Sequence, residues 1–365
     1  NLLTNARYYI QQGEIEKARE LYKAASKAFP KSKRVRQGLA QLDLAKPIIS
    51  DKQVPKDLID ELARLYNQRK FNVVVERGAQ ITKQYPNAFI IWNILGAANS
   101  ALGRTQIASE AFEKVTKINP KYADGFNNLG VVLQNQGKLD EAIKAYKSAL
   151  SLKPEYADAH NNMANTLKNQ SKLNEAIKAY KKAVNFRPDY PEAYFNMGNT
   201  FTIMGEIDQA IESYQQALSL KPNYVEAYRN IGAVLQEQGK SKEAITFYRK
   251  ALSLRPDYAE VYNNIGTALQ DQRNLGEAIA SYQNALSLRP DYAEVYFNMG
   301  TALQEQGKLG DAISFYRKVL NLNPEHTKAH RHISLLLKYQ PEDPQITSVG
   351  DLLKRNDIRD NDRCQ

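Results

Sequence analysis

Apolar residues recur along the chain with the spacing of two consecutive amphipathic helices. Within residues 123–156, the first apolar stripe has the i, i+3, i+4, i+7 spacing of one helix face and consists of Phe126, Leu129, Gly130 and Leu133. After Gly137, which is suited to end a helix, a second stripe follows and consists of Ala142, Tyr146, Ala149 and Leu150. Pro154 cannot continue a helix, so the unit is predicted to be a helix pair.

This pattern repeats with a period of 34 residues. Further copies follow without insertion or deletion at 157–190, 191–224, 225–258, 259–292 and 293–326, and looser copies occupy 55–88 and 89–122. A fixed period of this length is typical of stacked supersecondary units. The sequence therefore predicts an all-α fold, an α-solenoid of antiparallel helix pairs.

The residues of each unit resemble the tetratricopeptide repeat (TPR): an aromatic residue, Leu-Gly, and then Ala, Tyr, Ala and Pro at that family's spacing. The resemblance covers residues 55–326 closely and residues 1–30 loosely. It implies a right-handed superhelix. Departures are few: Ala164 and Ser334 replace the glycine within the first helix, and Ser171 and Arg273 replace the glycine that ends it.

The periodicity also divides the chain into segments. A divergent repeat and a half-repeat are expected first, followed by a linker, eight repeats in register, an unpaired helix and a tail. The predicted ranges are 1–46, 47–54, 55–326, 327–339 and 340–365.

The polar tail resembles the joining segment of bacterial proteins that carry TPRs ahead of a sulfotransferase domain. The residues that carry this resemblance are Asp343-Pro344-Gln345-Ile346, Leu352-Leu353 and Asp362-Arg363. It implies a larger bacterial protein whose catalytic half begins beyond Gln365.

The helix predicted at 89–102 is apolar on both sides. Trp92 and Leu95 lie on the core face, whereas Ile90 and Ile94 make the opposite face apolar too. A helix that is apolar all round is normally covered on both sides. We expect residues 47–57 or the N-terminal block to cover it; the alternative is an apolar anchor for a ligand.

Composition limits the cellular setting and the partners. The single cysteine, Cys364, excludes a disulfide within the chain and fits a reducing compartment, so a cytoplasmic location is expected. No apolar run reaches the length that spans a membrane, so no membrane partner is expected. The formal net charge of +10 raises nucleic acid as a partner, and the position of the charge decides whether it fits.

Few residues could carry chemistry. There is no glycine-rich phosphate loop and no cysteine pair. His326 and His330 have the i, i+4 spacing of a zinc pair, with His332 nearby, but no further ligand completes a site. We expect these histidines to pack, and this chain to have no enzymatic activity, cofactor or metal.

The candidate binding surface lies opposite the core stripe of each first helix, and the resemblance implies that it lines a concave channel. In the 123–156 repeat it comprises Asp124, Asn128, Val131 and Asn135. Asparagine recurs at its centre in six successive repeats, at Asn128, Asn162, Asn196, Asn230, Asn264 and Asn298. Repeats of the O-linked N-acetylglucosamine transferase are similar, and there such a ladder grips the backbone of an extended peptide. Alternatively, the asparagines tie one helix to the next.

Acidic residues open the same surface in the same six repeats, at Asp124, Asp158, Glu192, Glu226, Glu260 and Glu294. Acids also favour the first turn of a helix, which is a structural reason for their presence. Basic residues gather on the second helices instead, for example Lys181, Lys182, Arg249 and Lys250. We therefore expect a neutral or basic peptide in the channel and no nucleic acid there, because phosphate affinity needs a continuous basic track.

Three functions remain open. The first is a non-catalytic scaffold that binds an extended peptide segment of a partner. The second is the substrate-recruiting half of a sulfotransferase or glycosyltransferase, inactive alone. The third is a structural unit that self-associates end to end, because the last helix has no partner and a non-closing contact makes filaments.

Overall fold

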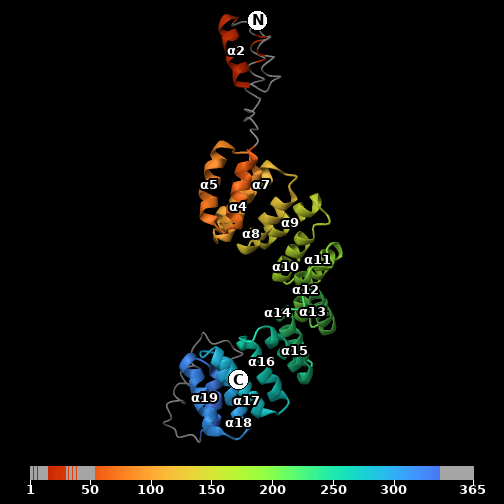
Figure 1. The fold of residues 1–365 in the computed structure, drawn as a ribbon, viewed down its shortest axis with the longest axis vertical. Coiled ribbons are helices and arrows are strands. Elements are labelled where there is room, and N and C mark those ends of the chain that lie inside the picture. The colour runs from red at the N-terminus through yellow and green to blue at the C-terminus, as the bar shows by residue number, and fades with distance from the viewer. Residues whose placement is uncertain are drawn as a thin grey trace. The chain divides into compact units, whose positions relative to one another are not determined.

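The computed structural model describes residues 54–337 and 15–29, together with the single positions 3, 6, 32, 35 and 38. The chain splits into two compact units, Asn1–Pro154 and Glu155–Gln365, each considered by itself below. Throughout the described residues the regular structure is α-helical (Figure 1). The predicted all-α solenoid of helix pairs is confirmed.

The helices have regular lengths and follow one another through short turns. The first unit contains α2 (Ile15–Ala28), α4 (Lys56–Asn67), α5 (Phe71–Gln84), α6 (Phe89–Ala101), α7 (Thr105–Ile118), α8 (Ala123–Asn135) and α9 (Leu139–Leu152). The second contains α10 (Ala157–Asn169), α11 (Leu173–Phe186), α12 (Pro191–Met204), α13 (Ile207–Leu220), α14 (Val225–Glu237), α15 (Ser241–Leu254), α16 (Ala259–Asp271), α17 (Leu275–Leu288), α18 (Ala293–Glu305), α19 (Leu309–Leu322) and α20 (Thr327–Leu336).

The turn inside each repeat requires one residue in the left-handed conformation. Gly137 and Gly239 supply it with φ of 76° and 74°. Where the sequence departs from glycine, Ser171 and Arg273 take the same conformation, with φ of 60° and 62°. The turn is therefore kept even where the residue is unfavourable for it, because the packed helices on both sides fix its geometry.

In the six repeats between residues 123 and 326, a tyrosine of the second helix fills the space between the paired helices. These side chains are almost completely buried: Tyr146, Tyr180, Tyr214, Tyr248, Tyr282 and Tyr316. Five of these rings, all except that of Tyr180, lie against a glycine of the first helix, so closely that a Cβ on Gly232 would be 2.5 Å from Cε1 of Tyr248. The repeating Gly-and-Tyr pattern thus sets the separation of the two helices.

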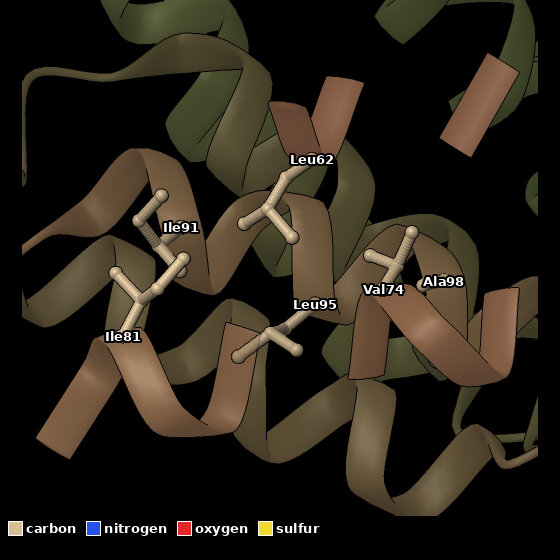
Figure 2. Packing of buried hydrophobic residues seen from close by; sticks show 6 residues of the cluster. All are labelled: Leu62, Val74, Ile81, Ile91, Leu95 and Ala98. Atoms are coloured by element: carbon tan, nitrogen blue, oxygen red, sulfur yellow. The ribbon is translucent and has the colours of Figure 1, made fainter. Parts of the chain in front are cut away.

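The core of α4, α5 and α6 accounts for the apolar helix predicted at 89–102. Its buried residues are Leu62, Val74, Ile81, Ile91, Leu95 and Ala98 (Figure 2). Ile90 and Ile94 are half-buried and pack against this cluster, as do Val54 and Leu58. Part of the expected cover is thus Val54 and α4, while residues 47–53 lie outside the described residues.

The last helix of the described residues is α20. It packs on α19 through the buried Ile333, whereas Leu335 is 69% exposed. Positions 338–339 of the predicted helix and the tail at 340–365, including the segment that resembles a sulfotransferase linker, lie outside the described residues. End-to-end self-association through α20 stays a prediction.

Candidate functional site

The predicted binding positions lie on the accessible side of each first helix. In the second unit we call this surface the first-helix face: the second, sixth, ninth and thirteenth residues of α10, α12, α14, α16 and α18. The same four positions of α8 belong to the first unit and are considered with it. In each of these helices all four positions are half-buried or exposed. In α16, for example, Glu260, Asn264 and Asp271 are accessible, whereas Val261 and Ile265 between them are buried. The helical pattern therefore placed these positions on an accessible side of the helices, and their role in binding stays a prediction.

Most of the six asparagines bond to the preceding repeat. Asn128 Nδ2 donates to Asn93 Oδ1 at 3.1 Å. In the second unit, Asn196 donates to Asn161 at 3.4 Å and Asn298 donates to Asn263 at 3.0 Å, each across 35 residues. These bonds support the alternative role for the asparagines, that of tying one helix to the next.

Two asparagines differ because the residue 35 positions earlier differs. The residue 35 positions before Asn230 is Phe195, so Asn230 donates instead to Asn199 Oδ1 at 2.7 Å. The residue 35 positions before Asn264 is Arg229. Within the described residues, the Asn264 carboxamide makes no hydrogen bond, and the Nε of Arg229 is buried without a partner. At Asn162, the Thr166 hydroxyl donates to the backbone carbonyl.

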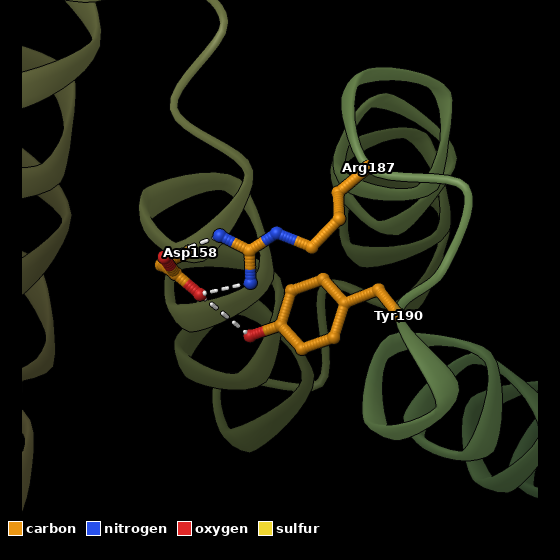
Figure 3. Close-up of polar contacts among 3 residues, drawn as sticks. All are labelled: Asp158, Arg187 and Tyr190. Atoms are coloured by element: carbon orange, nitrogen blue, oxygen red, sulfur yellow. Dashed lines mark hydrogen bonds and ion pairs between the residues drawn. The ribbon is translucent and has the colours of Figure 1, made fainter. Parts of the chain in front are cut away.

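In four repeats, the acid that opens the face is paired with the base that directly follows the second helix of the same repeat. The two outer nitrogens of Arg187 donate to the two carboxylate oxygens of Asp158 at 2.8 and 2.7 Å. The Tyr190 hydroxyl donates to Asp158 Oδ1 at 3.0 Å, and the guanidinium lies 4.6 Å from the Tyr190 ring centroid (Figure 3). The arrangement is an acid–base–tyrosine triad.

Three further repeats contain the same acid–base contact 29 residues apart. The nitrogen-to-oxygen distances are 3.7 Å for Lys221–Glu192, 2.8 Å for Arg255–Glu226 and 3.3 Å for Arg289–Glu260. Each of these bases also lies over a tyrosine ring, at Tyr224, Tyr258 and Tyr292. A projection of one helix does not include these bases, whose sequence signal is a Lys or Arg immediately before the proline of these repeats.

The pairing offsets the acidic charge of the face. Partial burial acts to raise the pKa of the Glu226 carboxyl, but its own backbone N–H and Arg255 outweigh this, and the pKa is lowered. The hydrogen bond with Asp158 is the main reason why the pKa of Arg187 is raised. Burial and then Asp158 raise the pKa of Tyr190 to about 12. All three groups therefore keep their charge state at neutral pH.

Glu294 is the exception among the acids of the second unit. Asn323 stands where the other repeats carry the base, so no cation pairs with it there. Its carboxylate accepts a hydrogen bond from Asn263 Nδ2 at 3.4 Å. In the first unit, Asp124 interacts with the nearby Tyr122, whose pKa is raised by burial and then by Asp124. Among the acids that open the first helices of the second unit, Glu294 is thus the one without an ion-pair partner in the described residues.

Glutamines connect the buried tyrosines to the far end of the face. The Tyr248 hydroxyl donates to Gln236 Oε1 at 3.2 Å, and Gln236 Nε2 donates to Asp271 Oδ2 of the next repeat at 2.8 Å. In the following repeat, Gln270 donates in the same way to Glu305 at 2.7 Å. In each of these two repeats, a hydrogen-bonded chain therefore joins the buried tyrosine to the accessible face.

The three C-terminal histidines make structural contacts. His326 Nδ1 accepts the backbone N–H of Ala329 at 3.1 Å and so caps α20, while His330 Nε2 lies 2.9 Å from the Pro324 carbonyl oxygen. His332 Nδ1 is 3.1 Å from the Tyr316 hydroxyl. Burial lowers the pKa of both His326 and His332. Within the described residues there is no group of three or more side chains that could hold a metal ion.

We expect acidification to loosen α20. The pKa of His326 and that of His332 are both lower in the folded protein than the value of about 6.5 for an unfolded chain. The stability that this difference contributes is fully present above pH 6.5, and it is lost as the pH falls through the folded-state pKa. Thermal melts of the wild type should therefore move to lower temperature between pH 7.5 and pH 5.5. The variant His326→Ser/His332→Asn, which keeps an N-cap oxygen but has no titrating ring at either position, should show a flatter dependence. Equal pH dependence in both proteins would contradict the assignment.

Sequence comparisons identify repeats along most of the chain. Family profiles described as TPR repeat match residues 133–171, 165–205, 198–239 and 235–273. Others described as tetratricopeptide repeat match residues 6–42, 90–122, 111–144 and 257–325. No curated protein matches the chain.

Several solved structures are similar. MamA protein is 28% identical, covering 47% of this chain and 94% of its own, with a TM-score of 0.44. PilF of Pseudomonas aeruginosa is 19% identical over 58% of this chain and 97% of its own, with a TM-score of 0.51. The APC/C hetero-tetramer Cut9–Hcn1 is 16% identical over 92% of this chain and 76% of the matched one, also at 0.51. The last two agree with the solenoid fold.

Among the described residues, no helix is long and apolar enough to cross a bilayer.

Proposed function

The chain belongs to the tetratricopeptide repeat family, and we propose that it is a protein-interaction scaffold whose first-helix face binds an extended segment of a partner protein. The observation that carries this proposal is the row of half-buried asparagines along the face. A carboxamide has two N–H donors and one acceptor oxygen, which match the acceptor and donor of a peptide group. The bonds between repeats use one donor of Asn128, Asn196 and Asn298 and leave the second donor and the oxygen.

The ion pairs bear on the chemistry of the segment. Because Asp158, Glu226 and Glu260 are each offset by an arginine, a basic segment gains little from them unless it displaces that arginine. Exposed ion pairs contribute only about 0–1 kcal/mol, so displacement is feasible. A neutral segment that uses its backbone fits most of the face, and a basic residue fits best beside Glu294.

The two C-terminal asparagines of the ladder allow a matched test. Asn264→Ala removes a carboxamide with no partner, so binding should weaken about two- to ten-fold while stability stays unchanged. Asn298→Ala should weaken binding to a similar degree and also destabilise the fold by roughly 1 kcal/mol, because Asn263 loses a partner. Fluorescence anisotropy measures binding, with peptides selected from a phage-displayed library of unstructured sequences, and thermal melts measure stability.

Peptides of different sequence provide the control, because backbone recognition predicts a similar loss for all of them. If Asn264→Ala binds every selected peptide as tightly as the wild type, the ladder does not recognise ligand. The asparagines would then serve only to connect the repeats.

A further inference from the structure

A further charged surface lies on the second helices of the repeats in the second unit, Glu155–Gln365. We call it the second-helix stripe: the sixth, ninth, tenth and thirteenth residues of α11, α13, α15, α17 and α19. All of these positions are exposed. The bases on the stripe are Lys178, Lys181, Lys182, Arg249, Lys250, Arg317 and Lys318, and Glu212 is its one acid. Where bases are missing, amides stand at Gln215, Gln216, Gln283 and Asn284.

These bases are not neutralised within the described part of the chain. None of the seven belongs to an ion pair there, whereas Arg187, Lys221, Arg255 and Arg289 on the other side of the repeats are each paired with an acid. The positive charge of the C-terminal unit is thus concentrated along the stripe. The cations form three clusters, on α11, α15 and α19, separated by helices that have amides at the same positions. Exposed cations without acidic partners are what a polyanion needs, and the amides between the clusters can also donate hydrogen bonds to phosphates.

Aromatic rings lie beside two of the basic clusters. In the 225–258 repeat, the rings of Tyr228 and Phe247 are 6.4 Å apart. They border a hollow whose remaining walls are Thr246, Arg249, Lys250 and Ser253. The hollow therefore combines two half-buried ring faces with two cations.

The same constellation recurs two repeats later. The rings of Tyr296 and Phe315 are 6.1 Å apart, and Lys318 lies 4.6 Å from the Phe315 ring centroid. In the intervening repeat, Ser281 replaces the phenylalanine and Gln283 replaces the arginine. Two aromatic rings and two adjacent cations therefore occur together in the 225–258 repeat and again in the 293–326 repeat, with one repeat between them.

We propose that the second-helix stripe binds single-stranded nucleic acid, with phosphates on the cation pairs and bases stacked on the rings beside them. Stacking on aromatic side chains combined with a basic backbone track is the general mode of single-strand binding. A duplex would use the cations but not the rings, because its bases are already stacked. An anionic membrane would favour protruding apolar groups, whereas these rings are half-buried around a hollow. The amides at the intervening positions can bond to phosphates or base edges.

Anisotropy of a labelled oligothymidine, measured across a salt series, tests the proposal. The affinity of the wild-type protein for the oligothymidine should fall steeply with salt. In a plot of the logarithm of the binding constant against the logarithm of the salt concentration, the slope should be about −0.7 for each phosphate contacted. The variant Arg249→Ala/Lys250→Ala/Arg317→Ala/Lys318→Ala should bind at least about ten-fold more weakly, with a shallower slope. A control removes the same charge from exposed lysines in the turns, by Lys138→Ala/Lys172→Ala/Lys240→Ala/Lys308→Ala, and should keep most of the affinity.

The rings are tested separately. Phe247→Ala/Phe315→Ala should lose about five-fold in affinity per ring or more, with an unchanged salt slope. Phe247→Leu/Phe315→Leu keeps apolar bulk without a π-face and should show the same loss, which separates stacking from misfolding.

Three results would overturn the assignment. The first is an equal loss in the stripe and turn variants. The second is that the ring variants bind oligothymidine as tightly as the wild type, and that polyglutamate displaces the labelled oligothymidine as well as an unlabelled oligonucleotide does. The third is binding to anionic vesicles without binding to the oligothymidine.

Discussion

Replacing Tyr248 with alanine is expected to destabilise the protein by about 3–5 kcal/mol, the range for removing a large buried aromatic side chain. The Tyr248 ring is 1% exposed and lies against Gly232 of the paired helix. The backbone around it is held by helices on both sides, so the cavity cannot close fully. Chemical denaturation monitored by circular dichroism measures the change.

Tyr248→Phe is the matched control for this prediction. It keeps the ring and removes the hydroxyl that donates to Gln236, which should destabilise by roughly 0.5–1.5 kcal/mol. Solenoid repeats contact only their neighbours, so a second transition from local unfolding is also an expected sign in the alanine variant. An alanine variant as stable as the phenylalanine variant would show that the ring does not set the helix separation.

Gly232→Ala is expected to destabilise by about 1–3 kcal/mol, the usual range for adding a methyl group to a packed core. The added Cβ would lie 2.5 Å from Cε1 and 2.7 Å from Cδ1 of Tyr248. The ring has no free space to move into, because it is itself buried. The two helices must therefore separate or the ring must leave its rotamer.

The control for this change is Gly276→Ala, on the exposed side of α17. A Cβ there meets nothing within 4 Å. Because alanine restricts the unfolded chain and favours a helix, this variant should be stabilised by roughly 0.5–1 kcal/mol. Opposite signs for the same substitution would establish that the contact, and not helix propensity, matters at Gly232. A neutral Gly232→Ala would contradict the packing described above.

The sequence was sufficient for the fold because every repeat contains the same local signals. Apolar spacing located both helices, and the positions of Ser171 and Arg273 in the pattern identified their turns although neither is glycine. The accessible face followed from helix geometry alone. These features depend on neighbours within one helix or one turn, which a linear pattern records.

The electrostatics of the face could not be obtained in the same way. Arg187 meets Asp158 from 29 residues away, at the opposite end of the repeat, so a projection of one helix does not include it. The asparagine bonds also depend on a second helix, 35 residues earlier, where Phe195 and Arg229 interrupt the pattern. Contacts between helices therefore changed the predicted acidic, unpaired face into one with mostly paired acids.

The acid–base–tyrosine triad has a consequence for how such an array can change length. Asp158, Arg187 and Tyr190 all belong to one 34-residue period, so duplication or excision of a whole period leaves every triad intact. The asparagine bonds connect successive periods instead. Excision of residues 225–258 would replace Arg229 by Phe195 as the residue 35 positions before Asn264. It would remove Glu226 and Arg255 together, so no acid or base of the retained 29-residue pairs would lose its partner. Recombination in this gene can therefore vary the reach of the array while each retained period keeps its own charge balance.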